Sequence, residues 1–197
     1  MMKRDLWFPT PVWSGRFDNI TEHEFNLAAD HCLSEMKKSD GRVYTNVGGW
    51  QSNDFDPFDV NHVALSRFFD QIHQNFDQLR RDLDIGRNLR FDNAWINING
   101  KNHYNAVHDH PLAWLAGVFY LTERNSEIVF HRQQDISSWH NKMMGSQMRT
   151  PLTFLSANYS PKQGDFFIFP AWLMHNVIPN SNEDTERISI AFNITLV

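Results

Sequence analysis

From residue 90 onward the sequence consists of short apolar runs separated by glycine, proline and asparagine, with no helical periodicity between them. Runs of this length, bounded by turn-forming residues, are typical of β-strands. Because no helix separates them, we expect antiparallel strands arranged as a sandwich or barrel. The expected strands are 90–99, 113–121, 127–131, 165–169 and 186–196.

Two helices are expected before this region, which makes the chain α+β and mainly β. Thr21 and Glu24 form a Thr-x-x-Glu capping box, which satisfies free N–H groups at a helix start. Apolar residues then recur every three or four positions, so we expect a helix over 21–38. A second such pattern predicts a longer helix over 60–83. Both helices are expected to pack on one side of the β structure.

A length of 197 residues is the size of one domain. We expect a single unit over 1–197, with a helical support region at 1–88 and a β core at 89–197. Segment 133–160 is the least regular, and a loop of this length in a compact domain is often functional.

Charge and composition disfavour several classes of protein. The formal net charge of −5 argues against nucleic acid as the main partner, because phosphate binding needs a basic face. The N-terminus lacks the apolar core of a signal peptide, and no apolar run approaches about 18 residues. We therefore expect a cytoplasmic protein with no membrane partner. The single cysteine, Cys32, excludes an internal disulfide, and the oligomeric state, including a homodimer, stays open.

Three histidines are the candidate metal ligands. If the segment around Asp109 is extended, His108 and His110 point to one side of the backbone and Asp109 to the other. His175 has apolar neighbours on its N-terminal side, so the alternative there is a hydrogen-bonded histidine of the core. Neutral imidazole is a good ligand for Fe, Zn, Cu or Ni. A His-x-His pair alone does not establish a metal site, so these residues by themselves leave open whether His108, His110 and His175 bind a metal.

A charged residue interrupts the last expected strand. Arg187 precedes Ile188 and Ile190 in an otherwise apolar run. A buried charge needs a partner, because an unpaired one is costly. That partner is either an internal Asp or Glu, or a bound carboxylate, for which a guanidinium gives a bidentate fit.

Taken in their order along the chain, these motifs resemble those of the 2-oxoglutarate and Fe(II)-dependent dioxygenases. Within that family they are most similar to a bacterial and phage branch related to prolyl hydroxylases. The resemblance covers 95–193 and implies a double-stranded β-helix, or jelly roll. It also implies Fe(II) as cofactor and 2-oxoglutarate as cosubstrate, in a hydroxylase that releases succinate and CO₂. The matching stretches are WINING at 95–100, YNAVHDHP at 104–111, AGVFYL at 116–121, FPAWLMHNV at 169–177 and RISIAFN at 187–193.

The resemblance implies an iron site with one departure. His108 matches the first iron ligand of the family and His175 the last. His110 stands where the family usually has an Asp or Glu. A three-histidine site carries one less negative charge, and Asp109 could replace His110 only through a bulge in the strand. We expect three histidines.

The resemblance also implies the cosubstrate contacts. Arg187 matches the basic residue that holds the far carboxylate of 2-oxoglutarate, and Ser189 and Tyr120 match residues that share this group. Asn97 is expected beside them. Residues expected to contact substrate or to support the ligands are Asn105, Trp95, Asn193 and Trp172.

Three functions stay open on the sequence. The first is a hydroxylase that acts on a peptidyl or small-molecule substrate with 2-oxoglutarate. The second is a three-histidine iron dioxygenase without 2-oxoglutarate, in which Arg187 binds a carboxylate of the substrate. The third is a non-enzymatic jelly-roll binding or structural protein. A zinc hydrolase is disfavoured, because no well-placed Glu stands out as a general base.

Overall fold

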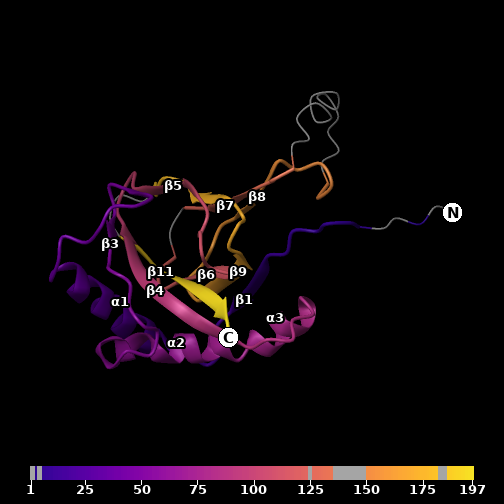
Figure 1. The fold of residues 1–197 in the computed structure, drawn as a ribbon. Coiled ribbons are helices and arrows are strands. Elements are labelled where there is room, and N and C mark those ends of the chain that lie inside the picture. Colours follow the sequence, from indigo (N-terminus) through magenta and orange to yellow (C-terminus); the bar gives the residue numbers. More distant parts are fainter. Residues whose placement is uncertain (1–2, 4–5, 124–125, 135–149, 182–185) are drawn as a thin grey trace.

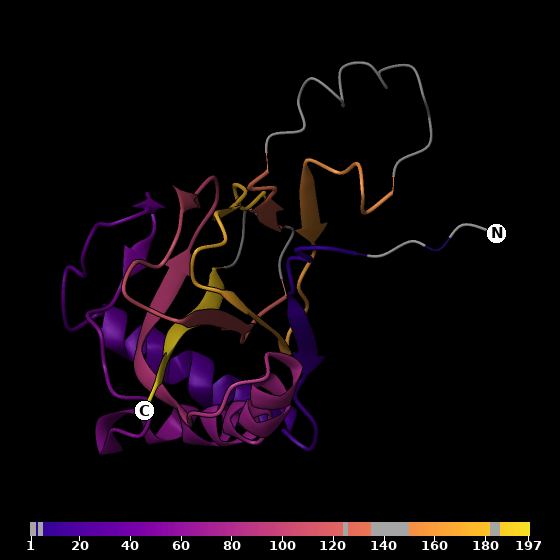
Figure 2. The ribbon, with the colours of Figure 1, turned by 45° about the vertical axis from the view of Figure 1, so that its right-hand side comes forward.

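Two antiparallel sheets face each other, and helices cover the outer face of the larger one (Figures 1 and 2). The structure is a computed structural model and describes residues 3, 6–123, 126–134, 150–181 and 186–197. The expected α+β class, with β structure dominant, is confirmed. Within the described part of the chain, no helix has the length and apolar character needed to cross a membrane.

The larger sheet has six strands in the order β1-β9-β6-β11-β4-β3. Its central strand pairs are long, since β11 pairs with β4 on one side and with β6 on the other. The strands of this sheet are β1 (Trp13–Arg16), β3 (Trp50–Gln51), β4 (Leu89–Asn99), β6 (Leu115–Tyr120), β9 (Asp165–Pro170) and β11 (Arg187–Leu196).

The smaller sheet has five strands in the order β2-β5-β10-β7-β8. From β4 to β7 and again from β9 to β11, strands adjacent in sequence alternate between the sheets, whereas β7 and β8 both belong to the smaller sheet. The strands of this sheet are β2 (Asn46–Val47), β5 (Tyr104–His108), β7 (Ile128–His131), β8 (Ser156–Tyr159) and β10 (His175–Val177).

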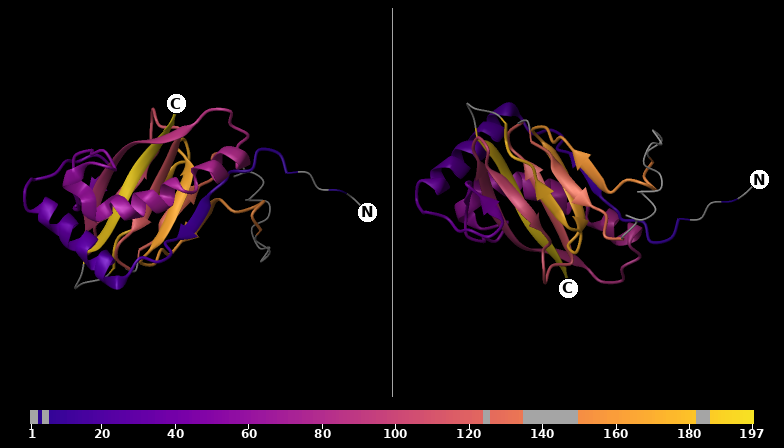
Figure 3. Two further views of the ribbon diagram at one scale, coloured as in Figure 1. Left: turned by 90° about the horizontal axis from the view of Figure 1, so that it is seen from below. Right: turned by 90° about the horizontal axis from the view of Figure 1, so that it is seen from above.

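The helices cross the outer face of the larger sheet, as the view from below shows (Figure 3). The first, α1 (Glu22–Met36), begins at the predicted capping box, in which the Thr21 side chain accepts from the Glu24 N–H. The expected single helix over 60–83 is wrong. It is divided into η1 (Val60–His62), α2 (Val63–His73) and α3 (Phe76–Asp82). Asn75 Nδ2 donates to the Gln71 carbonyl oxygen (2.8 Å), so a side chain competes with the helical backbone at the break.

The sequence of β6 is apolar throughout because the strand is buried on both faces. All six residues are buried, because the helices cover one face and the smaller sheet covers the other. Phe119 stacks on Phe68 of α2 with ring centroids 5.5 Å apart. Ala116, Val118 and Tyr120 point the other way, into the layer between the sheets.

All five strands expected from the sequence are present. The expected segments 90–99, 113–121, 127–131, 165–169 and 186–196 correspond to β4, β6, β7, β9 and β11. The expectation of an irregular 133–160 segment is wrong at its end, where Ser156–Tyr159 forms β8. Residues 135–149 of that segment lie outside the described part of the chain.

Candidate functional site

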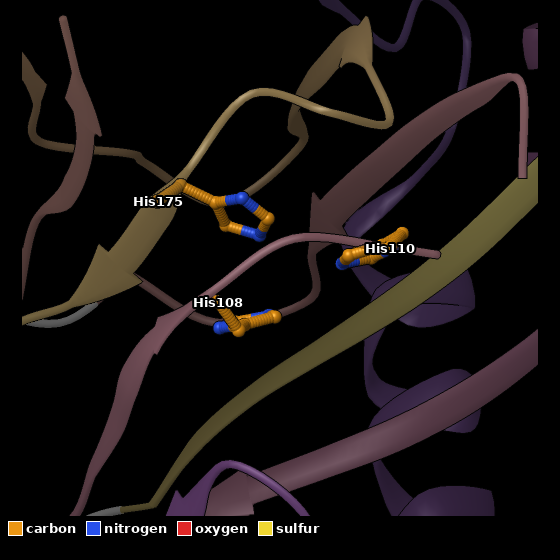
Figure 4. A group of neighbouring side chains, drawn as sticks. All are labelled: His108, His110 and His175. Carbon is orange, nitrogen blue, oxygen red and sulfur yellow. The ribbon is translucent and has the colours of Figure 1, made fainter. Parts of the chain in front are cut away.

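His108, His110 and His175 are brought together between the two sheets (Figure 4). One ring nitrogen of each lies within 4.8 Å of one from each of the others, which is close enough to share a metal ion. His175 of β10 is the register partner of His108 of β5, and their ring centroids are 4.2 Å apart. His110 follows β5, where its N–H donates to the Ala171 carbonyl oxygen (2.9 Å).

Each histidine ring is held through its Nδ1 atom. The Nδ1 of His108 lies 2.7 Å from the Ala106 carbonyl oxygen, and that of His175 lies 2.8 Å from the Leu173 carbonyl oxygen. The Nδ1 of His110 lies 2.7 Å from Oδ1 of Asn193. A carbonyl oxygen only accepts, so Nδ1 donates in all three cases. Each Nε2 then keeps its lone pair for a metal ion, which is the usual arrangement of metal-binding histidines.

The same site keeps these rings uncharged. Burial lowers the pKa of His108, and it lowers the pKa of His110 to about 4 against the effect of the Asn193 hydrogen bond. Burial, reinforced by the two neighbouring histidines, lowers the pKa of His175 to about 2. Neutral imidazoles bind metals without losing a proton first. Among the described residues, the metal-compatible group contains these three histidines, and Asp109 is exposed outside it.

Arg187 is a buried cation with no carboxylate beside it among the described residues. The side chain is 2% exposed, and its Nη1 donates to Ser126 Oγ at 2.5 Å. Its buried Nε has no hydrogen-bond partner in the described part of the chain. Burial lowers the pKa of Arg187, and the nearby Tyr120 acts in the opposite direction. The internal Asp or Glu left open by the sequence is therefore absent from the described part of the chain, and a bound carboxylate fits the vacant donor.

A polar row crosses the larger sheet and consists of Ser189, Asn97 and Tyr120. Ser189 lies two residues after Arg187 on β11. Ser189 is the register partner of Asn97 on β4 and of Tyr120 on β6. Directly opposed residues share a face of the sheet, so the three side chains lie side by side. The Oδ1 of Asn97 is buried and has no hydrogen-bond partner among the residues that the structure describes. Burial raises the pKa of Tyr120 to about 12, which keeps its hydroxyl a hydrogen-bond donor.

A cavity of about 270 Å³ connects the histidines with the polar row. Its apolar wall includes Val118, Ile128 and Phe169. Nearly all the site residues expected from the sequence line it, namely Trp95, Asn97, Asn105, His108, His110, Tyr120, His175, Ser189 and Asn193.

Two expected residues are placed differently. Arg187 does not line the cavity, although it lies on the same face of β11 as Ser189. The expectation for Trp172 is not met. Trp172 is 51% exposed and lines another hollow, together with Trp7 and Phe8. Trp172 lies in the turn between β9 and β10, which places its side chain outside the cavity.

Residues from the N-terminal region also line the cavity, and the sequence did not reveal them. Arg42 packs over the Tyr44 ring, 4.8 Å from its centroid, and forms an ion pair with Asp54. Asn46 stabilises this segment by donating to the carbonyl oxygens of Arg42 and Gly49. These contacts are local, but the pairing of β2 with β5 and of β3 with β4 brings the segment to the cavity, so no local sequence motif marks its residues as part of the site. The lining residues of this region are Arg42, Tyr44, Thr45, Gln51 and Asp54.

Several solved structures share this fold. The chain has a TM-score of 0.64 and 12% identity to a Pseudomonas putida prolyl-4-hydroxylase, with 93% of this chain and 92% of that chain covered. The viral collagen prolyl hydroxylase of Paramecium bursaria Chlorella virus-1, in complex with 2-oxoglutarate, has a TM-score of 0.57 and 14% identity to the chain. The match covers 92% of this chain and 94% of that chain. HygX from Streptomyces hygroscopicus, with nickel and 2-oxoglutarate bound, has a TM-score of 0.59 and 13% identity to the chain, with 94% of this chain and 83% of that chain covered.

The family is shown by the sequence itself. No curated protein matches the chain. Residues 93–193, just over half of the 197, match the family model described as "Putative 2OG-Fe(II) oxygenase". The match contains the three histidines, the polar row and Arg187, and it confirms the resemblance stated from the motifs. The Fe(II) and 2-oxoglutarate expected from those motifs agree with the family and with the donor set of the site. The chain belongs to this family of 2OG-Fe(II) oxygenases.

Proposed function

We propose that this protein is a 2-oxoglutarate-dependent hydroxylase that acts on a peptidyl or small-molecule substrate. One observation carries the proposal. A buried arginine without a carboxylate partner in the described chain lies on the same side of the larger sheet as a three-histidine cluster. A metal site alone fits many enzymes, whereas a metal site beside a carboxylate receptor fits a dicarboxylate cosubstrate.

The fold supports the proposal as a double-stranded β-helix. Successive strands from β4 to β7 pass alternately to the larger and the smaller sheet, and β9 to β11 do so again. Such an arrangement places the faces of both sheets around one central cavity. The histidines come from the smaller sheet and the segment after β5, and the polar row comes from the larger sheet.

His108, His110 and His175 would hold the metal through Nε2, and Arg187 would hold the far carboxylate of 2-oxoglutarate. Between the metal and Arg187, the cosubstrate would form hydrogen bonds with Ser189, Tyr120 and Asn97. With 2-oxoglutarate and dioxygen, the bound Fe(II) supplies hydroxylation of a C–H bond with release of succinate and CO₂.

The protein's own contribution is positioning and exclusion of water. An apolar wall of Phe169, Val118 and Ile128 lies beside the histidines and excludes water. The exclusion of water strengthens the electrostatic contacts made there. Arg42, Tyr44 and Asp54 line the same cavity with exposed atoms, so we assign them to the substrate side. Their mixture of a cation, an anion and a phenol suits a polar substrate.

The test uses the protein with Fe(II) and 2-oxoglutarate. Under anaerobic conditions, the two together should give a visible charge-transfer band that neither gives alone, and exposure to air should release succinate. His175→Ala should abolish the band, whereas His73→Ala should not, because His73 is an exposed residue outside the cavity. The absence of both the band and succinate from the wild-type protein would refute the proposal.

A second function is favoured by His110. This residue stands in the usual carboxylate position, and three neutral ligands leave the metal more positive than the usual set. A three-histidine iron dioxygenase without 2-oxoglutarate would bind the substrate's own carboxylate at Arg187. Fe(II) binding without any effect of 2-oxoglutarate on the spectrum supports this alternative.

A further inference from the structure

The geometry points to Asn193, itself fixed by Asn93, as the residue that orients His110 for metal binding. This inference rests on the proposed metal site and adds two positioning residues to it. Neither asparagine is a metal ligand. Each acts through another residue, and together they form a chain from β4 through β11 to the imidazole.

The three histidines differ in what holds them. His108 and His175 are each bonded to the carbonyl oxygen of the residue two positions earlier in the same segment. Those acceptors belong to the backbone, so no side-chain substitution removes them. The acceptor for His110 is the side chain of Asn193, 83 positions away in sequence. His110 is thus the member of the cluster whose orientation depends on another side chain.

The amide of Asn193 has two orientations, and Asn93 favours one. Asn193 and Asn93 are register partners on β11 and β4, and Asn193 Nδ2 donates to Asn93 Oδ1 at 2.8 Å. This bond turns Oδ1 of Asn193 toward His110, 2.7 Å from its Nδ1. The pairing of β4 with β11 shifts register directly after Asn193, and such bulges re-aim neighbouring side chains.

The orientation determines which nitrogen of His110 can bind a metal. With Oδ1 facing the ring, Nδ1 carries the proton and Nε2 keeps its lone pair. With the amide reversed, its NH₂ group would face Nδ1, which would favour the proton on Nε2 and block coordination. Asn93 therefore controls the tautomer of His110 through Asn193.

The proposal predicts opposite results for two substitutions of Asn193. Asn193→Ala removes the acceptor, and loss of a group that orients a metal-binding histidine weakens metal affinity by about 10–100-fold. Asn193→Asp keeps an acceptor at the same place, so its affinity should equal or exceed that of the wild type. A purely structural role in β4–β11 pairing predicts no such difference in metal affinity.

Asn93 offers a second, independent pair of variants. Asn93→Asp presents only acceptor oxygens, so it keeps the bond from Asn193 Nδ2 and should bind metal like the wild type. Asn93→Leu has no acceptor and should bind more weakly. Asn158→Ala is the matched control, because Asn158 is an exposed asparagine of β8 whose amide donates to Glu127 away from the cavity.

The experiment titrates each protein with Co(II) and follows the visible absorption bands, which report the ligand geometry. Melting of the metal-free proteins shows whether each variant is folded. Weaker affinity and altered bands in Asn193→Ala and Asn93→Leu, with both Asp variants and the control like wild type, support the proposal. Wild-type affinity in Asn193→Ala overturns it. If Asn193→Ala does not fold, equal affinities of Asn93→Leu and Asn93→Asp overturn it. No Co(II) binding by the wild-type protein would defeat the proposed metal site itself, and this inference with it.

Discussion

At the residue scale, His110 is the third histidine of the candidate site and stands where the resemblance implied an Asp or Glu. It lies in the metal-compatible cluster, whereas the adjacent Asp109 is exposed. The sequence implied this cluster through its resemblance to the family, since the His-x-His spacing alone places only His108 and His110 on one side of an extended segment. It could not predict Asn193 as the hydrogen-bond acceptor of His110, because that contact depends on the pairing of β4 with β11.

Arg187 gives the first prediction at this scale. Arg187→Met should weaken binding of N-oxalylglycine, an inert analogue of 2-oxoglutarate, by about 2–5 kcal/mol, the usual effect of truncating a buried charged partner. Binding of Mn(II) alone should not change. The ligand-free variant should be at least as stable as the wild type, because it no longer buries a charge that lacks a carboxylate partner among the described residues.

Calorimetric titration checks the prediction, and Arg67→Met is the control. Arg67 is an arginine on α2 that forms an ion pair with Glu24, far from the cavity lining. N-oxalylglycine affinity that is unchanged in Arg187→Met would remove Arg187 from the cosubstrate site.

At the element scale, the sequence predicted what local patterns determine. The capping box located the start of α1, and turn residues bounded β4, β9 and β11. It missed β2 and β3, which have two residues each, because such short strands exist only through their partners. It also missed the break between α2 and α3, where the apolar periodicity continues through the interruption.

The packing between elements predicts the effect of a glycine substitution. A Cβ on Gly117 of β6 would lie 2.2 Å from Phe192 Cζ and 2.9 Å from the Phe167 carbonyl oxygen. Gly117→Ala should therefore destabilise the protein by about 1–3 kcal/mol, as overpacked cores do. Gly86→Ala, where nothing lies within 4 Å, should be nearly neutral. Urea unfolding measures both, and equal stabilities would show that β6 tolerates the added methyl group.

A histidine pair predicts pH dependence where α1 meets η1. His31 Nε2 and His62 Nδ1 are 2.9 Å apart, and burial lowers the pKa of both, although Glu35 acts against it. Their pKa values are lower in the folded than in the unfolded state. The lowered pKa values therefore cost no stability above a pH of about 6.5, and the free energy of unfolding decreases as the pH falls below it.

The variant His31→Gln isolates this effect. It removes one titrating group and the repulsion between two charged rings. Between pH 7 and pH 5, the wild type should lose more free energy of unfolding than His31→Gln does. Denaturant titrations at the two pH values provide the comparison, and equal losses would contradict a role for the pair.

At the scale of the whole molecule, the candidate site joins the two sheets. His108 and His175 belong to the smaller sheet, and Ser189 and Tyr120 belong to the larger one. A metal and a cosubstrate bound together would therefore link the sheets. Mn(II) with N-oxalylglycine should raise the melting temperature by more than the sum of their separate effects. A bound ligand at about 100 times its dissociation constant contributes about 2.7 kcal/mol.

Differential scanning calorimetry measures these increments, with Arg187→Met as the control that should retain only the effect of Mn(II). Strictly additive effects in the wild-type protein would show that the metal and the analogue bind independently.

The proposed site is a metal ion held by three histidines, with a bound carboxylate at Arg187. A crystal structure with Mn(II) and N-oxalylglycine tests it most directly, with the metal located by anomalous scattering. We expect one metal peak at coordination distance from Nε2 of His108, His110 and His175, and the far carboxylate of N-oxalylglycine on Arg187. A metal ligated by Asp109 in place of His110, or an analogue bound away from Arg187, would contradict it.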